Sequence, residues 1–345
     1  MIFSKTLAEH KSKPKVSVVL PVFNAANTLK RAVDSMLCQK YDHWQLVIVN
    51  DGSTDGTLKY LRDLDDQRIA IYTLPHCGIG RALNFGIRMS SGEYIARMDA
   101  DDVSSCHRLS SQAYYLDQNP SVGLVSGQVT YMGDRTTQAG YAHYVDTINA
   151  IVKEEDIVHK RFFESPFAHP SVMFRKSLIA QYGGYNEQSL PEDYELWLRW
   201  LSNGVRMHKL DQEVLCWYDS KQRLSRTNLN YAPGKFFDVK AHYFHFWLAG
   251  NSDRIKQIWV FGSGKEVNRR LRPFIKRGIT IERFIDVKKR YNVSKYIHFN
   301  DLPEADANGS RLILSFVRDR AGREAILTLL QQLRYKEGVD FFIMA

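Results

Sequence analysis

The sequence predicts an α/β protein with a mostly parallel sheet and helices on its faces, and three features of its first hundred residues support this fold class. Apolar runs rich in β-branched residues, such as 16–23 and 45–49, are typical of strands buried on both faces. Segments with helical spacing of apolar residues separate these runs. Short polar turns follow the runs, as in right-handed βαβ units.

The predicted elements alternate along the chain. The predicted strands are 16–23, 45–49, 69–72, 94–96 and 122–127. The predicted helices are 29–37, 57–64, 81–89 and 108–118. Thr54 or Asp55 is the expected N-cap of the second helix, and Asn119-Pro120 closes the fourth. Residues 131–160 match no strong pattern and are interpreted as a variable insertion.

Three carboxylates, Asp99, Asp101 and Asp102, follow the strand at 94–96. Such groups repel one another and need a cation nearby if they are buried. Asp99 and Asp101 alternate, so an extended backbone would point them the same way, and oxygen ligands suit Mg²⁺ or Mn²⁺. An acidic turn that caps the next helix explains these residues about as well, so the Asp-x-Asp pattern alone leaves both interpretations open.

Phe23, Asp51 and the acidic cluster each follow a predicted strand. In parallel sheets of this kind, ligands bind at the carboxyl ends of the strands. The three strand ends therefore offer an aromatic face, a carboxylate and a metal site to one crevice. For Asp51 the alternative is an ordinary turn with a helix cap.

The blocks at these strand ends resemble the signature blocks of family 2 glycosyltransferases, which have the GT-A fold. The blocks are Pro21–Asn24, Val49–Gly56, Ala82–Ile87, Gly92–Ala96 and Met98–Asp102. The resemblance covers residues 15–230. It implies a metal-dependent, inverting glycosyltransferase that moves a sugar from a nucleotide-diphosphate donor, a UDP-sugar, to a glycan or lipid-linked acceptor in bacterial surface polysaccharide synthesis.

The resemblance also assigns residues to the donor nucleotide. The nucleotide-binding residues it implies are Pro21, Phe23, Asn24, Asp51, Asp99 and Arg226. Phe23 would contact the base, and Asp51 would accept from a uracil N–H or a ribose hydroxyl. Asn50 stands where the family often has a first Asp, which leaves the base contact to Asp51. For Arg226 a solvated loop is the alternative.

The metal ligands that the resemblance implies are Asp99, Asp101 and His169, with Mn²⁺ or Mg²⁺ as the cofactor. His169 belongs to a block similar to the His-Pro-Ser-Val block of the family, although a packed loop histidine is the alternative. Asp193 matches the catalytic base, which takes the proton of the acceptor hydroxyl, and Glu192 would orient the site or help to bind the acceptor. Two acids in the first turn of a helix also serve as a cap, so capping is the alternative for this pair.

Residues 1–14 are interpreted as a leader, 231–254 as a connecting helix and 255–345 as a Rossmann-like domain. The last segment starts with a strand and a glycine turn at 258–264 and places Asp286 about twenty residues on, as dinucleotide-binding units do. Val267 or Asn268 replaces the third glycine of that fingerprint. A structural or docking role and nucleotide binding are therefore both open for this domain.

The 345 residues carry a formal charge of +9, which favours anionic partners, and Lys and Arg crowd the C-terminal third. The four scattered cysteines suit the cytoplasm. No apolar run is long enough to span a membrane. We expect a cytoplasmic enzyme with no nucleic-acid partner, and peripheral contact with the inner membrane and a homo-oligomer are both compatible with the sequence.

Two other functions are weighed. A nucleotidyltransferase would carry a Gly-rich basic loop after the first strand, and Pro21–Ala25 is not such a loop. A binding protein that senses a nucleotide through the C-terminal domain would have no need of Asp99, Asp101 and Asp193. Donor sugar, acceptor, linkage and oligomeric state are left open by the sequence.

Overall fold

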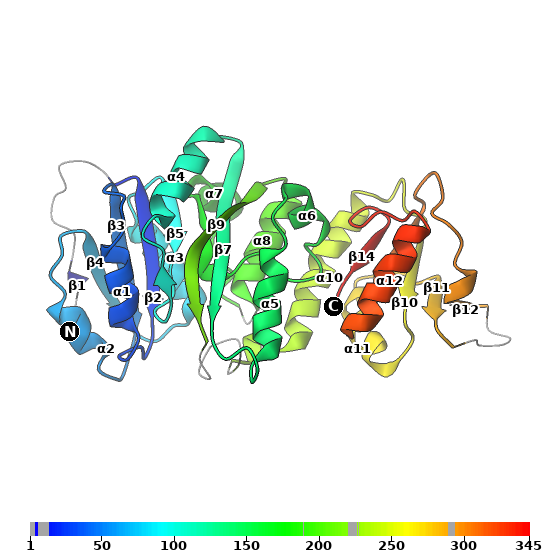
Figure 1. The fold of residues 1–345 in the computed structure, drawn as a ribbon, viewed down its shortest axis with the longest axis horizontal. Coiled ribbons are helices and arrows are strands. Elements are labelled where there is room, and N and C mark those ends of the chain that lie inside the picture. Colours follow the sequence, from blue (N-terminus) through cyan, green and yellow to red (C-terminus); the bar gives the residue numbers. More distant parts are fainter. Residues whose placement is uncertain (1–3, 6–13, 189, 220–225, 227, 289–293) are drawn as a thin grey trace. The chain divides into compact units, whose positions relative to one another are not determined.

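The computed structural model describes residues 4–5, 14–188, 190–219, 226, 228–288 and 294–345 (Figure 1). The chain forms two compact units. Unit 1 consists of residues 1–154 and 167–228, and unit 2 of residues 155–166 and 229–345. Most of the predicted leader, residues 1–14, lies outside the residues that the structure describes.

Unit 1 contains a nine-stranded sheet in the order β1-β4-β3-β2-β5-β8-β7-β9-β6. Its strands are β1 (Ser4–Lys5), β2 (Val16–Val22), β3 (Trp44–Asp51), β4 (Ile69–Leu74), β5 (Tyr94–Arg97), β6 (Val103–Ser104), β7 (Val122–Met132), β8 (Met173–Arg175) and β9 (Arg206–Tyr218). Strands β2 to β5 are parallel to one another, which confirms the predicted core of the sheet. The short strand β8 is antiparallel to both β5 and β7.

The helices of unit 1 cover both faces of this sheet. They are α1 (Leu29–Leu37), α2 (Thr57–Asp63), α3 (Ile79–Met89), α4 (Arg108–Gln118), α5 (Ala139–Asn149), α7 (Ser177–Tyr182) and α8 (Glu192–Ser202). Alternate residues of β2 and β3 join one core with α1, α4 and α5. Val47 and Val49 point to the other face and pack on α3. Gly86 lets α3 approach closely, since a Cβ there would lie 2.6 Å from Val19 Cγ1.

Two details of the predicted elements were wrong. The N-cap of α2 is Gly56, and Asp55 instead accepts a hydrogen bond from the Thr57 N–H at 2.9 Å. Helix α3 begins at Ile79, two residues before the predicted start, because Gly78 with φ +89° turns the chain directly into it. The region 131–160 contains the end of β7, α5 and α6 (Glu154–His159).

Unit 2 contains a five-stranded parallel sheet in the order β12-β11-β10-β13-β14. Its strands are β10 (Gln257–Phe261), β11 (Arg283–Asp286), β12 (Tyr296–His298), β13 (Arg311–Ser315) and β14 (Phe341–Ile343). Its helices are α10 (Pro233–Ala249), α11 (Lys265–Ile275) and α12 (Arg320–Gln332). Helix α12 packs on one face of the sheet through Ile326 and Leu330. Phe274 of α11 contacts Phe244 of α10 and Phe316.

Residues 155–166 belong to unit 2, although the sequence analysis assigns them to the first domain. The physical reason is aromatic packing. Phe162 is buried against Phe244 and Phe342, with ring centroids 5.7 and 5.2 Å apart. Lys240 Nζ donates to the carbonyl oxygens of Phe163 and Met344, both at 2.8 Å.

In the part of the chain that the structure describes, none of the helices combines the length and the apolar character that crossing a bilayer requires.

Candidate active site

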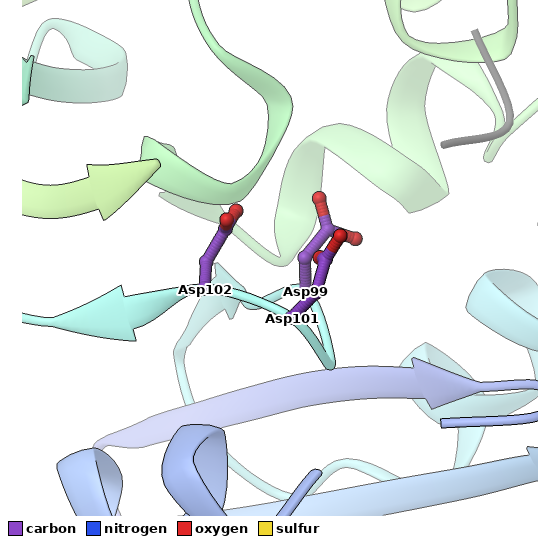
Figure 2. A group of neighbouring side chains, drawn as sticks. All are labelled: Asp99, Asp101 and Asp102. Atoms are coloured by element: carbon purple, nitrogen blue, oxygen red, sulfur yellow. The ribbon is translucent and has the colours of Figure 1, made fainter. Parts of the chain in front are cut away.

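The acidic turn after β5 brings three carboxylates together. Asp99, Asp101 and Asp102 each place one oxygen within 4.8 Å of the oxygens of the others. Figure 2 shows all three side chains rising from this turn toward the same side. Asp102 is fully buried, and its Oδ1 accepts from the Tyr218 N–H of β9 at 2.9 Å. Because these oxygens converge and are hard ligands, the turn fits a Mg²⁺ or Mn²⁺ ion.

A buried arginine beside this turn was not given a role by the sequence analysis. Arg97, the last residue of β5, is 2% exposed and forms an ion pair with Asp99. Burial lowers the pKa of Arg97, but Asp99, Tyr185 and Glu192 together raise it above its ordinary value, so the guanidinium stays charged. Arg97 therefore supplies part of the positive charge that the three neighbouring carboxylates require. A charged residue inside an apolar strand, just before a run of acids, is the signal that could have identified it.

The start of α8 presents the predicted catalytic pair to the same arginine. Burial raises the pKa of Asp193 to about 6, and Arg97 and the Tyr194 N–H, which donates to Asp193 Oδ1 at 2.7 Å, hold it from rising further. Glu192 is 4% exposed. The carboxyl of Asp193 is thus partly shielded from water yet ionised at neutral pH, which suits a general base.

His169 is not a member of the group formed by Asp99, Asp101 and Asp102. Among the described residues, these three carboxylates are the group of potential metal ligands that lie close together. Its Nε2 is 2.8 Å from the Tyr185 hydroxyl, and its Nδ1 is 3.9 Å from Glu192 Oε1. Burial, followed by the charge of Arg97, lowers the pKa of His169 well below its usual value, so its ring is neutral. His169 as a metal ligand stays a prediction.

At the carboxyl end of β3, Asp51 holds the loop before α3. Its carboxylate accepts from the Cys77 N–H at 2.7 Å and the Gly78 N–H at 3.0 Å, and its Oδ2 lies 3.0 Å from His76 Nδ1. The ring of His76 stacks on Phe23 with centroids 4.3 Å apart. The sequence analysis missed His76, and no local pattern marks it, because its neighbours come from the ends of two other strands.

Phe23 leaves an aromatic face accessible, since 45% of the residue is exposed. Pro21 lies in β2 beside Val49 of β3. Asn24 has φ +51° and ties the two loops together, because its side-chain oxygen accepts from the Thr54 N–H at 2.8 Å. The structure thus gathers four of the predicted nucleotide-binding residues, Pro21, Phe23, Asn24 and Asp51, at adjacent strand ends.

Arg226 is held by its own surroundings. Its guanidinium forms an ion pair with Asp219 at 2.7 Å, donates to Gln138 Oε1 at 3.1 Å and lies 4.1 Å from the centre of the Tyr141 ring. These contacts fix the end of the β9 loop on α5. Whether Arg226 also reaches the diphosphate stays a prediction.

Comparison with known proteins adds independent findings. The model of glycosyl transferase family 2 matches residues 17–183. The O-antigen biosynthesis glycosyltransferase WbnJ of Escherichia coli is 32% identical over 208 residues, which are 58% of this chain and 78% of WbnJ. The UDP-Gal:alpha-D-GlcNAc-diphosphoundecaprenol beta-1,3-galactosyltransferase of E. coli is 29% identical over 242 residues, which are 68% of this chain and 84% of that enzyme.

Among solved structures, S. aureus TarS 1–349 in complex with UDP-GlcNAc has a TM-score of 0.53 and 16% sequence identity. The match covers 76% of this chain and 81% of that one. At this identity the likeness shows a common fold.

Proposed function

Because the chain belongs to glycosyl transferase family 2 and is a glycosyltransferase, we propose that it transfers a sugar from a UDP-sugar to a glycan or lipid-linked glycan of a bacterial surface polysaccharide, with inversion and with a divalent metal. The observation that carries this proposal is the position of Arg97. Arg97 forms an ion pair with Asp99 of the acidic turn, and its charge also lowers the pKa of Asp193 of α8. A leaving-group side and a base side therefore meet around one buried cation.

Each residue group has a distinct task in this proposal. Phe23 and Asp51 hold the uracil and ribose at the ends of β2 and β3. Asp99 and Asp101 would hold the metal, with Arg97 fixing the Asp99 carboxylate, and His169 would contribute a neutral nitrogen on the diphosphate side. Mg²⁺ or Mn²⁺ bound there would act as a Lewis acid toward the diphosphate.

Asp193 accepts the proton of the acceptor hydroxyl as that oxygen attacks the anomeric carbon. The new glycosidic bond forms on the face opposite the leaving group, the bond between the anomeric carbon and the phosphate oxygen breaks, and UDP leaves with the electron pair. Glu192 orients the site beside Asp193. Arg226 supplies a further positive charge for the departing diphosphate.

The relatives support the donor and acceptor classes. One E. coli relative is named for a UDP-Gal donor and a diphosphoundecaprenol-linked acceptor, and the other for O-antigen biosynthesis. We therefore propose a nucleotide diphospho-sugar and a lipid-linked or polysaccharide acceptor for this chain as well.

The test is a panel of UDP- and GDP-sugars incubated with the full chain and Mn²⁺ or Mg²⁺, with release of the nucleoside diphosphate as the readout. We expect metal-dependent turnover of one UDP-sugar, lost in both Asp193→Asn and Asp101→Ala. Thermal shifts with UDP and GDP are measured in parallel, since turnover also needs an acceptor. Failure of UDP, with or without metal, to stabilise the protein would refute the proposal.

A further inference from the structure

The net positive charge of the chain arises in its C-terminal part. Residues 229–345 hold 21 Lys and Arg against 12 Asp and Glu, whereas residues 1–228 hold 26 of each. The formal charge of +9 therefore arises from the residues that build most of unit 2. A charge of one sign gathered in one unit indicates where an anionic partner would bind.

Within unit 2, helix α11 arranges four cations in a single row, which we call the α11 stripe. The stripe consists of Lys265, Arg269, Arg272 and Lys276, all exposed. Their spacing of four, three and four residues places them on one face of a helix, and Lys276 continues the helical backbone as the C-cap. The opposite face is apolar and buried, so the stripe points to solvent.

Most of the stripe is not neutralised within the protein. Arg269 forms an ion pair with Glu266 at 2.7 Å. Lys265, Arg272 and Lys276 form no ion pair with the residues that the structure describes. The helix dipole favours a cation near the carboxyl end of α11, which accounts for Lys276. The same dipole disfavours a cation in the first turn, so helix stability does not account for Lys265.

An exposed apolar side chain accompanies these cations. Ile275, the last residue of α11, is 53% exposed and directly precedes Lys276. Helices that lie at a bilayer surface combine a row of Lys and Arg with apolar side chains that enter the headgroup region. Clusters of four or more such cations on an amphipathic helix are attracted to anionic lipids.

We propose that the α11 stripe docks unit 2 on an anionic lipid bilayer, with Ile275 entering the headgroup region. This inference goes beyond the proposed transfer reaction and does not depend on it. A bilayer fits better than a nucleic acid, because the stripe pairs its cations with an apolar side chain and not with an exposed aromatic ring of α11 on which bases could stack.

The experiment uses the full chain and sedimentation with vesicles of phosphatidylcholine, with or without phosphatidylglycerol, at low and physiological salt. We expect binding to the anionic vesicles only. The combined variant Lys265→Gln, Arg272→Gln and Lys276→Gln should bind them about 100-fold more weakly, since each cation near the surface contributes about fivefold. Ile275→Ser should reduce the part of the binding that resists salt.

A matched control removes three exposed cations from unit 1, as Lys40→Gln, Lys59→Gln and Lys153→Gln. It changes the net charge equally, and we expect its binding to change less than about threefold. Circular dichroism checks that both variants are folded. Both should keep the thermal shift with UDP, so that a failed donor site and a failed docking surface give different results.

Three results would overturn the proposal. The wild type could fail to bind anionic vesicles. Both triple variants could weaken binding equally, in which case net charge and not the stripe is responsible. Finally, a soluble polyanion such as polyuridylate could bind the stripe more tightly than the vesicles do, which would assign the surface to a polymer.

Discussion

The two units present the carboxyl ends of parallel strands in contrasting ways. In unit 1, Asn24 joins the loops after β2 and β3, and Asp51 joins the end of β3 to the loop after β4. Arg97 pairs with Asp99 in the turn after β5, and a Cβ on Gly52 would lie only 2.7 Å from the His76 backbone nitrogen. In unit 2, a Cβ on Gly264 would meet none of the described heavy atoms within 4 Å. The two parallel sheets are similar, but the side chains and loops at their strand ends differ. Because chemistry resides in these side chains, similar sheets can support different functions.

The sharpest test of this contrast compares one acid from each unit. We expect Asp193→Asn to lower the rate of sugar transfer by about 10³-fold, since general bases contribute 10²–10⁴-fold. Asp286→Asn, which removes the strand-end carboxylate bonded to Ser263 in unit 2, should leave the rate within about twofold. Steady-state kinetics with the identified donor measures both. Equal losses would mean that unit 2 takes part in the reaction.

The next largest effect concerns one buried cation from each unit. Arg97→Met should lower the free energy of unfolding by about 3–5 kcal/mol, because it leaves Asp99 without its buried partner. Lys240→Met should cost about 1–3 kcal/mol, since two carbonyl oxygens lose a donor. Calorimetric unfolding of the variants measures both. An unchanged transition in Arg97→Met would show that the ion pair does not stabilise unit 1, and Arg97→Lys serves as the conservative control.

The raised pKa of Asp193 predicts opposite effects on activity and stability. With a pKa of about 6, the base is protonated in acid, so the transfer rate should fall about tenfold per unit below pH 6. The folded pKa lies above the ordinary 3.8, so ionisation of Asp193 costs stability as pH rises from 3.8 to 6. Asp193→Asn should therefore be up to about 3 kcal/mol more stable than the wild type at pH 7.

The same Asp193→Asn variant should lose this advantage near pH 4, where the wild-type carboxyl is also neutral in the folded state. Urea unfolding at both pH values tests the sign. A variant that is less stable than the wild type at pH 7 would show that the carboxylate is stabilised in the folded state, contrary to its burial.

The smallest effect distinguishes two glycines, Gly52 just after the end of β3 and Gly264 at the N-cap of α11. Gly52 has φ +73°, so Gly52→Ala should cost about 1–2 kcal/mol and weaken UDP binding. Gly264 has φ −71° in open surroundings, so Gly264→Ala should change stability by no more than about 0.5 kcal/mol and leave UDP binding unchanged. Thermal unfolding and UDP titration compare the two. Equal costs would contradict the difference in crowding.

The sequence predicted most of what local patterns determine. The strands β2 to β5 are built around short apolar runs, which the sequence analysis recognised. Asp51, Asp99 and Asp193 stand within blocks of fixed order, so their positions at strand and helix ends could be predicted. The pairing of β8 between β5 and β7 depends on contacts between residues far apart in the chain. For the same reason, no sequence pattern showed that His76 stacks on Phe23. Arg97 and Asp99 are only two residues apart, so their ion pair had a local signal, a charged residue at the end of an apolar strand just before a run of acids, which the sequence analysis did not use.

The assignment of residues 155–166 to unit 2 has a consequence for synthesis on the ribosome. This segment emerges long before residues 229–345, which bury Phe162 and accept Phe163 into their core. The nascent chain must therefore carry two large aromatic side chains without their partners until its last residues are made. An expression fragment that stops near residue 230 would keep them exposed permanently, and we expect it to aggregate where the full chain stays dispersed.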